Sequence, residues 1–138
     1  MVVQVLYNLA GKPDVAASNA FDDVQADDWY CKAVSWAVSK GIISGATKTS
    51  FDPDAPMSRE DLASAVWRFA GEPKATAYLG VYNDAAEIHT YAKPAIAWMT
   101  RNYLMQGSNG YIQPGKAATR AELASILSQA TEAGLLNP

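Results

Sequence analysis

The sequence has little of the side-chain chemistry from which most catalytic and metal sites are built. It contains one cysteine, Cys31, and one histidine, His89, in 138 residues. A lone cysteine excludes an internal disulfide framework and a cysteine-rich metal centre, and we expect Cys31 to pack as a small apolar side chain in the first turn of a helix. A serine or cysteine triad would have His89 as its one base, and no nucleophile motif accompanies it. We therefore expect no enzyme activity, no metal site and no cofactor.

Long apolar runs and a basic surface are also missing. No apolar run approaches the ~20 residues of a membrane-spanning helix, so we expect no membrane insertion. The net charge is -3 and the lysines and arginines are scattered. Nucleic-acid binders usually carry a basic stripe, so we expect no nucleic-acid partner. An anionic ligand would have to be held in a local pocket.

What the chain does contain is a repeat, in which residues 21–73 are matched by residues 82–131. Landmark residues of the two copies lie 61 or 62 positions apart: Trp36 and Trp98, Gly45 and Gly107, Pro53 and Pro114, Arg59 and Arg120. Such self-similarity indicates supersecondary units that bury their apolar faces against each other. Functional residues are therefore expected among those that the copies share.

A third, partial copy opens the chain. Residues 1–13 align with residues 61–73, at an offset of 60, so that Met1 stands opposite Asp61 and Glu122. We expect the chain to begin inside the final helix of a preceding repeat, as a piece of a longer protein whose signal peptide would lie upstream. The predicted organisation is one domain, 1–138, with subrepeats 1–13, 21–73 and 82–131.

Each full repeat is predicted to hold two helices and no substantial strand. The first helix is expected over residues 29–40 and 91–102, with Asp28 and Thr90 as N-caps. Pro94 then falls in the first turn, where proline is tolerated best.

The ends of these helices differ between the copies. Gly41 suits a left-handed residue after the first helix, but Tyr103 stands at the aligned position, and there we expect Asn102 to take the left-handed conformation. A loop rich in glycine and proline follows. The second helix is expected over residues 59–70 and 120–130.

The four tryptophans lie at spacings compatible with a helical core. We expect them to pack in the core. The alternative that stays open is that at least one tryptophan at the rim stacks on a sugar ring. They are Trp29, Trp36, Trp67 and Trp98.

The start of the second helix carries the sharpest local pattern. Ser58 and Thr119 are expected at the N-cap, with Asp61 and Glu122 at the third helical position. This spacing is typical of a capping box, in which each side chain satisfies the backbone amide of the other residue.

The arginines Arg59 and Arg120 stand at the first helical position of the same turns. A cation there opposes the helix dipole, at about 0.3–1 kcal/mol. One interpretation is that the guanidinium and the free amides hold a carboxylate or phosphate. The other is that each arginine pairs with an acid of the fold, such as Asp22, Asp23 or Asp84, and ties loop to helix.

In order and spacing these segments resemble the S-layer homology (SLH) motif. They are Phe21-Asp22-Asp23-Val24, Gly41-Ile42-Ile43-Ser44-Gly45, Phe51-Asp52-Pro53 and Ser58-Arg59-Glu60-Asp61, with their counterparts in the second copy. The resemblance implies an all-α fold in which the helices after the motif arginines form a central three-helix bundle. Here that bundle would comprise residues 1–9, 59–70 and 120–130.

The resemblance also implies a function. It is extracellular anchoring to the cell wall or S-layer, through a pyruvylated secondary cell wall polymer bound in grooves between repeats, with the motif arginine contributing. The candidate ligand-binding residues are Arg59, Arg120, Ser58, Thr119, Gly45, Gly107 and Asn109. The alternative is a protein-interaction or spacer module that has lost glycan affinity. The partial first repeat also leaves open an oligomer formed through a missing or swapped repeat.

Overall fold

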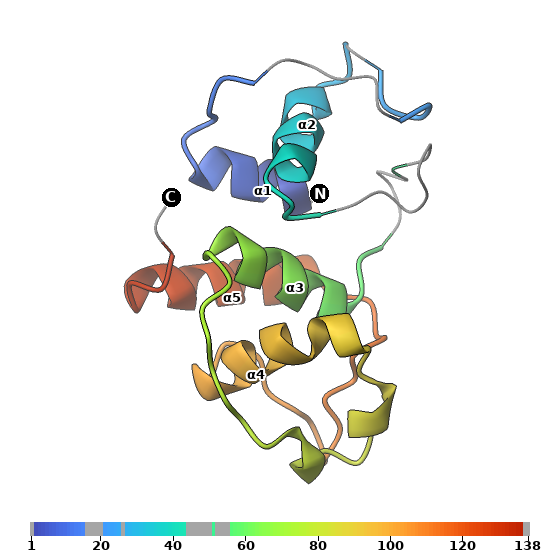
Figure 1. Ribbon diagram of the computed structural model, residues 1–138, viewed down its shortest axis with the longest axis vertical. Coiled ribbons are helices and arrows are strands. Elements are labelled where there is room, and N and C mark those ends of the chain that lie inside the picture. Colours follow the sequence, from blue (N-terminus) through green and yellow to red (C-terminus); the bar gives the residue numbers. More distant parts are fainter. Residues whose placement is uncertain (1, 16–20, 26, 44–50, 52–55, 137–138) are drawn as a thin grey trace. The chain divides into compact units, whose positions relative to one another are not determined.

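The computed structural model describes residues 2–15, 21–25, 27–43, 51 and 56–136 (Figure 1). Its helices are α1 (Val2–Leu9), α2 (Cys31–Ser39), α3 (Arg59–Phe69), α4 (Lys93–Arg101) and α5 (Arg120–Glu132), with three short 3-10 turns, η1 (Leu79–Val81), η2 (Ala85–Glu87) and η3 (Thr90–Ala92). The described residues form two isolated β-bridges and no strand, which confirms the all-α prediction. None of their helices is long and apolar enough to cross a membrane. The chain divides into two compact units, residues 1–55 and 56–137.

In the first unit, α1 packs against α2. The buried residues of α1 are Val3, Leu6 and Tyr7, spaced three and four apart, so that they share one face of the helix. The ring of Tyr7 meets that of Trp36 in α2, with centroids 5.6 Å apart. Two short helices are thus held together by one aromatic contact and an aliphatic face.

The end of α1 has the geometry of the end of α3. The Tyr7 hydroxyl donates to the Pro13 carbonyl at 2.8 Å, and the Trp67 indole N–H donates to the Pro73 carbonyl at 2.9 Å. Each helix is followed by two residues with positive φ. The aligned segments therefore share hydrogen bonds as well as sequence.

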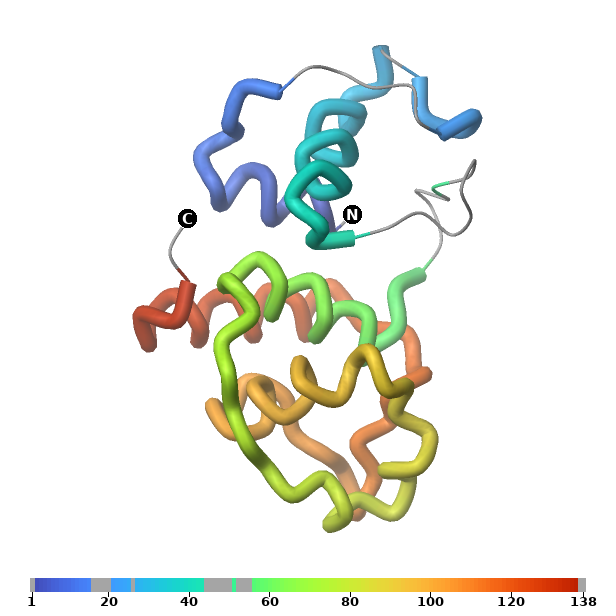
Figure 2. Tube along the Cα trace, viewed as in Figure 1, coloured from blue at the N-terminus to red at the C-terminus, as the bar shows by residue number. Residues whose placement is uncertain are grey.

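In the second unit, α3 packs against α4 and η3 (Figures 1 and 2). Alanines are prominent on the buried faces of both helices, and small side chains let the helix backbones approach closely. Leu62, Ile96 and Met99 are fully buried there, as is Ile112 from the loop before α5. Full burial of such a side chain is worth about 1.5–3 kcal/mol.

The first helix of each repeat starts later than predicted. Helix α2 begins at Cys31 and α4 at Lys93, and neither N-cap residue makes a side-chain cap. The Asp28 carboxylate instead accepts from the Gln25 amide at 2.8 Å. Thr90 is the first residue of the turn η3. The two predicted N-caps are therefore wrong, because short turns precede both helices. Pro94 does lie in the first turn, as predicted.

The helix ends follow the prediction in one copy only. Gly41 is left-handed, with φ 70°. In the other copy Tyr103 itself is left-handed, with φ 58°, whereas Asn102 has φ -98°. The Asn102 side chain donates to the Trp98 carbonyl at 2.9 Å and so caps the last turn, while the left-handed residue is the one after it.

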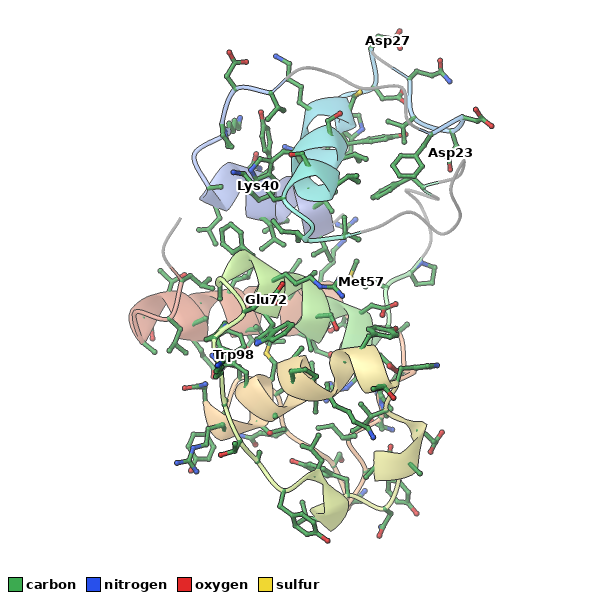
Figure 3. All side chains as sticks on the ribbon, viewed as in Figure 1. Asp23, Asp27, Lys40, Met57, Glu72 and Trp98 are labelled. Carbon is green, nitrogen blue, oxygen red and sulfur yellow. The ribbon has the colours of Figure 1, made fainter. Side chains whose placement is uncertain are left out.

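The tryptophans do not all lie in the core. Trp36 and Trp98 are buried, and Trp98 is labelled in Figure 3. Trp67 is half-buried, and Trp29 is 71% exposed and precedes α2. The packing prediction is therefore wrong for Trp29. Cys31 is buried as the first residue of α2, as predicted.

Candidate functional site

The two predicted N-caps of the second helices are present. Ser58 Oγ accepts from the Asp61 amide at 3.2 Å, and Thr119 Oγ1 accepts from the Glu122 amide at 3.0 Å. Both cap residues have extended backbone, as an N-cap requires. The same local sequence therefore starts α3 and α5 in the same way.

The acids of these two turns have other partners. Asp61 Oδ1 accepts from the Tyr91 hydroxyl at 2.5 Å, and Glu122 Oε2 lies 2.9 Å from Arg59 Nη1. Among the described residues neither acid returns a hydrogen bond to its N-cap amide, so the capping box is half formed. Burial, with the hydrogen bond to Asp61 second, raises the pKa of Tyr91 above its ordinary value.

Arg59 is enclosed by the fold. Besides its ion pair with Glu122, its Nε donates to the Ile112 carbonyl and its Nη2 to the Gln106 carbonyl, each at 3.1 Å. Its side chain is 12% exposed. The arginine of one repeat thus joins the start of α3 to the loop and the motif acid of the next repeat.

Two of the acids that the sequence offered as partners for the arginines, Asp84 and Asp23, bind backbone amides instead. Asp84 is buried, and its two carboxylate oxygens accept from the amides of Ile112 and Gln113 at 2.9 and 2.8 Å. Asp23 accepts from the Phe51 amide at 2.8 Å, which is the aligned contact of the first copy. These aspartates hold the loop of their own repeat. The partner of Arg59 is Glu122 instead.

The amides at the start of α3 are also occupied. Arg59 N donates to the Lys116 carbonyl at 2.9 Å, and Glu60 N donates to the Pro114 carbonyl at 3.0 Å. With the Ser58 cap on the third amide, this helix start has no free N–H to offer an anion. The convergence of guanidinium and amides expected from the sequence is therefore absent at α3.

Arg120 has the opposite environment. It is exposed at the first position of α5. Within the described part of the chain, its guanidinium and the amides of Arg120 and Ala121 make no hydrogen bond or ion pair. A cation and two N–H groups without a partner among the described residues thus stand at the positive end of a helix dipole.

Gly107 is required by close packing. A Cβ there would lie 2.5 Å from Tyr82 Cε1 and 3.0 Å from the Tyr111 carbonyl oxygen. The ring of Tyr82 therefore rests on the glycine backbone. Its counterpart Gly45 lies outside the described residues.

Asn109 forms a tight turn with Gly110. Both residues have positive φ, 53° and 85°. Ser108 and Tyr111 exchange two backbone hydrogen bonds across them, at 2.8 and 3.0 Å. An Asn-Gly pair favours this two-residue turn, because both positions need left-handed backbone.

Glu60 has a role that its place in the motif does not predict. Its side chain is 3% exposed and accepts from the His89 amide at 3.1 Å, with the His89 Nδ1 atom at 2.7 Å. The imidazole itself is 68% exposed. Glu60 therefore fastens the segment before α4 to α3. The hydrophobic periodicity of the sequence does not show that an acid at the second position of a helix will be buried, so this role could not be predicted from it.

Comparison with known proteins bears on this repeated turn. The sequence model described as "S-layer homology domain" matches residues 20–63 and 81–124, more than half of the chain. The chain belongs to the S-layer homology family. This S-layer homology domain is a noncatalytic module of the kind that anchors proteins to the cell wall.

Several curated proteins match most of the chain. The chain is 30% identical over 116 residues to the surface-layer 125 kDa protein of Lysinibacillus sphaericus. The match covers 81% of the chain and 10% of that protein. It is 29% identical over 118 residues to an endoglucanase of Bacillus sp. (strain KSM-635). That match covers 82% of the chain and 12% of the endoglucanase. It is 27% identical over 126 residues to the exoglucanase XynX of Acetivibrio thermocellus. That match covers 90% of the chain and 11% of the exoglucanase. The chain thus spans about a tenth of the length of these relatives.

Proposed function

We propose that the chain anchors its parent protein outside the cell by binding a secondary cell wall polymer that carries carboxylates, most simply a pyruvylated glycan. Family membership supports the anchoring role, and the relatives named as surface-layer proteins support the location. The observation that carries the proposal is Arg120, an exposed arginine at a helix start with no partner among the described residues.

The chemistry of this helix start suits a carboxylate. The planar guanidinium of Arg120 can take both oxygens of one carboxylate through parallel N–H bonds. The neighbouring amides of α5, which have no acceptor in the described part of the chain, and the positive end of the helix dipole favour the same anion. The Thr119 hydroxyl, which accepts from the Glu122 amide, still has its own proton to donate.

Arg59 has a supporting role in this proposal. Three of its five N–H donors are used inside the fold, which leaves two for a ligand. Ser58, Gly107 and Asn109 shape the cap and the loop around it, and Gly45 is proposed as the counterpart of Gly107 in the first copy.

Retention on purified cell wall, before and after chemical removal of pyruvyl groups, tests the proposal. Replacing Arg120 by alanine should weaken binding by about 1.5–3 kcal/mol, the value of a hydrogen bond to a charged group. Lysine should restore only part of the affinity, because it lacks the bidentate fork. Lys93→Ala, which removes an exposed charge from α4, is the matched control. Parental binding by the alanine variant, or unchanged binding to depyruvylated wall, would contradict the proposal.

A protein-interaction or spacer role is the second candidate, and the enclosure of Arg59 favours it. An arginine whose charge is neutralised by Glu122 has less to offer a ligand. Binding that follows wall proteins and survives removal of the glycan would support this role. Light scattering on the same samples would reveal an oligomer formed through an exchanged repeat.

A further inference from the structure

A shallow depression with an aromatic lining lies on the second unit, away from both motif arginines in sequence. Its volume is about 250 Å³. It is bordered by the segment around η1 and by the C-terminal end of α4. The lining residues are Ala77, Tyr78, Val81, Tyr82, Thr100, Arg101 and Tyr103.

The aromatic side chains of this depression are unusually exposed. Tyr78 is 79% exposed, Tyr103 is 74% exposed, and Val81, which also lines the depression, is 63% exposed. Single exposed apolar residues are normal, but a group of them marks an interaction site. Folding alone gives no reason for three such residues to share one small depression.

The backbone at the two tyrosines is unusual. A Cβ at Gly80 would lie 2.4 Å from Tyr78 Cζ, so the ring of Tyr78 rests on the glycine backbone. Tyr103 has the left-handed backbone, φ 58°, which costs a residue with a Cβ about 1–2 kcal/mol. The Tyr78 ring therefore lies against the chain, and Tyr103 stands where a side chain is placed only at a cost in backbone energy.

Arg101 supplies the charge of the depression. It is exposed, and it makes no hydrogen bond or ion pair with any other described residue. The neighbouring Thr100 hydroxyl is directed inward, toward the carbonyls of Ile96 and Ala97 at 2.9 and 3.2 Å. The lining therefore combines one cation with the hydroxyls and rings of tyrosine side chains.

We propose that this depression is a second contact site for an acidic polysaccharide, with a sugar ring stacked on Tyr78 and Tyr103 and a carboxylate held by Arg101. The inference rests on the proposed function, because it assigns the same polymer a second point of attachment. The C–H face of a sugar carries partial positive charge and suits the negative face of an aromatic ring. The arginine pairs with the acidic substituent.

The size of the depression favours a polysaccharide over the other kinds of ligand. Sites that enclose small molecules measure about 300–1,000 Å³, and this one is smaller and open. A stable protein interface involves roughly 20–30 residues a side, and seven residues line this depression. A polymer that lies across the surface needs only a few such contacts at each site.

The first test compares ring removal with ring retention. The double variant Tyr78→Ala/Tyr103→Ala should bind purified acidic wall polymer about tenfold more weakly than the parent chain, which corresponds to about 1.4 kcal/mol. The double variant Tyr78→Phe/Tyr103→Phe keeps both ring faces and should bind like the parent. Equal binding by parent and alanine variant would overturn this site while leaving the proposed function intact.

The second test moves a ring without removing it. Gly80 lacks the left-handed backbone that disfavours alanine, and the atoms in the way are the far end of the Tyr78 side chain. Gly80→Ala should therefore keep its unfolding midpoint, yet weaken polymer binding as Tyr78→Ala does. Parental affinity in a folded Gly80→Ala chain would mean that Tyr78 is not positioned for a ligand.

The third test concerns the charge. Arg101→Ala should weaken binding of the acidic polymer more than Lys93→Ala, which removes one charge from the same helix. Equal losses would overturn the role of Arg101. If the parent chain binds no wall polymer at all, the proposed function and this site fail together. Binding of wall proteins that depends on Tyr78 and Tyr103 would replace the polysaccharide by a protein partner.

Discussion

Arg59 and Arg120 occupy the same position of two aligned helices, yet their surroundings differ. Arg59 is neutralised by Glu122 and bonded to two loop carbonyls, because the loop of residues 106–116 folds over it. Arg120 has no such loop among the described residues. A shared motif therefore places one arginine in a structural role and leaves the other available.

This difference predicts unequal effects on stability. Arg59→Ala leaves Glu122 and two carbonyls without their donor, so the free energy of unfolding should fall by about 1.5–3 kcal/mol. Arg120→Ala should change it by less than about 0.5 kcal/mol. Urea titrations followed by circular dichroism give both values. Equal losses in the two variants would show that Arg120 also has a partner within the fold.

Asp84 is the second residue with a defined structural task. Alanine there would leave the amides of Ile112 and Gln113 without an acceptor, at about 1–3 kcal/mol for the buried amide of Ile112. We expect a lower urea midpoint with an unchanged slope. Glu87→Ala, which removes an exposed acid from η2, is the control and should unfold like the parent. A parental midpoint for Asp84→Ala would show that water replaces the carboxylate.

At the scale of elements, the loop between α4 and α5 is held in place by Tyr82 and by the Asn109-Gly110 turn. The loop in turn supplies the carbonyls that occupy the start of α3. Its geometry therefore decides how Arg59 is used.

Gly107→Ala should disturb this loop. The added Cβ would meet both the Tyr82 ring and the Tyr111 backbone, and overpacking of this kind costs about 1–3 kcal/mol. Gly115→Ala is the matched control in the same loop, since a Cβ there meets nothing within 4 Å. Differential scanning calorimetry should show a lower melting temperature for the first variant alone. Equal melting temperatures would mean that Tyr82 moves aside at no cost.

At the scale of the whole molecule, the predicted three-helix bundle would bring together helices from both compact units. The contacts of α1 and α2 belong to one unit, and those of α3 and α4 to the other. The bundle stays a prediction, which the cooperativity of unfolding can test.

Leu6→Ala provides that test. Leu6 is fully buried, so its truncation should cost about 2–5 kcal/mol. If α1, α3 and α5 share one core, hydrogen exchange should become faster in α3 and α5 as well as in α1 and α2. The control is Val5→Ala, because Val5 is 38% exposed on the same helix. Faster exchange confined to residues 1–55 would count against the bundle.

The sequence by itself determined the features that depend on local chemistry. The hydroxyl caps of α3 and α5, the left-handed Gly41, Pro94 in a first turn and the all-α class follow from short-range sterics and hydrogen bonding. Family membership likewise follows from residue order and spacing. All of these are properties of segments a few residues long, repeated along the chain.

Only the tertiary structure decided which groups find partners. Glu122 lies 63 positions from Arg59, and Glu60 lies 29 positions from His89, so no local pattern could pair them. The left-handed Tyr103 and the exposed Trp29 likewise depart from the local expectation. The physical reason is that hydrogen-bond satisfaction and burial depend on long-range packing, which two copies of one motif do not experience alike.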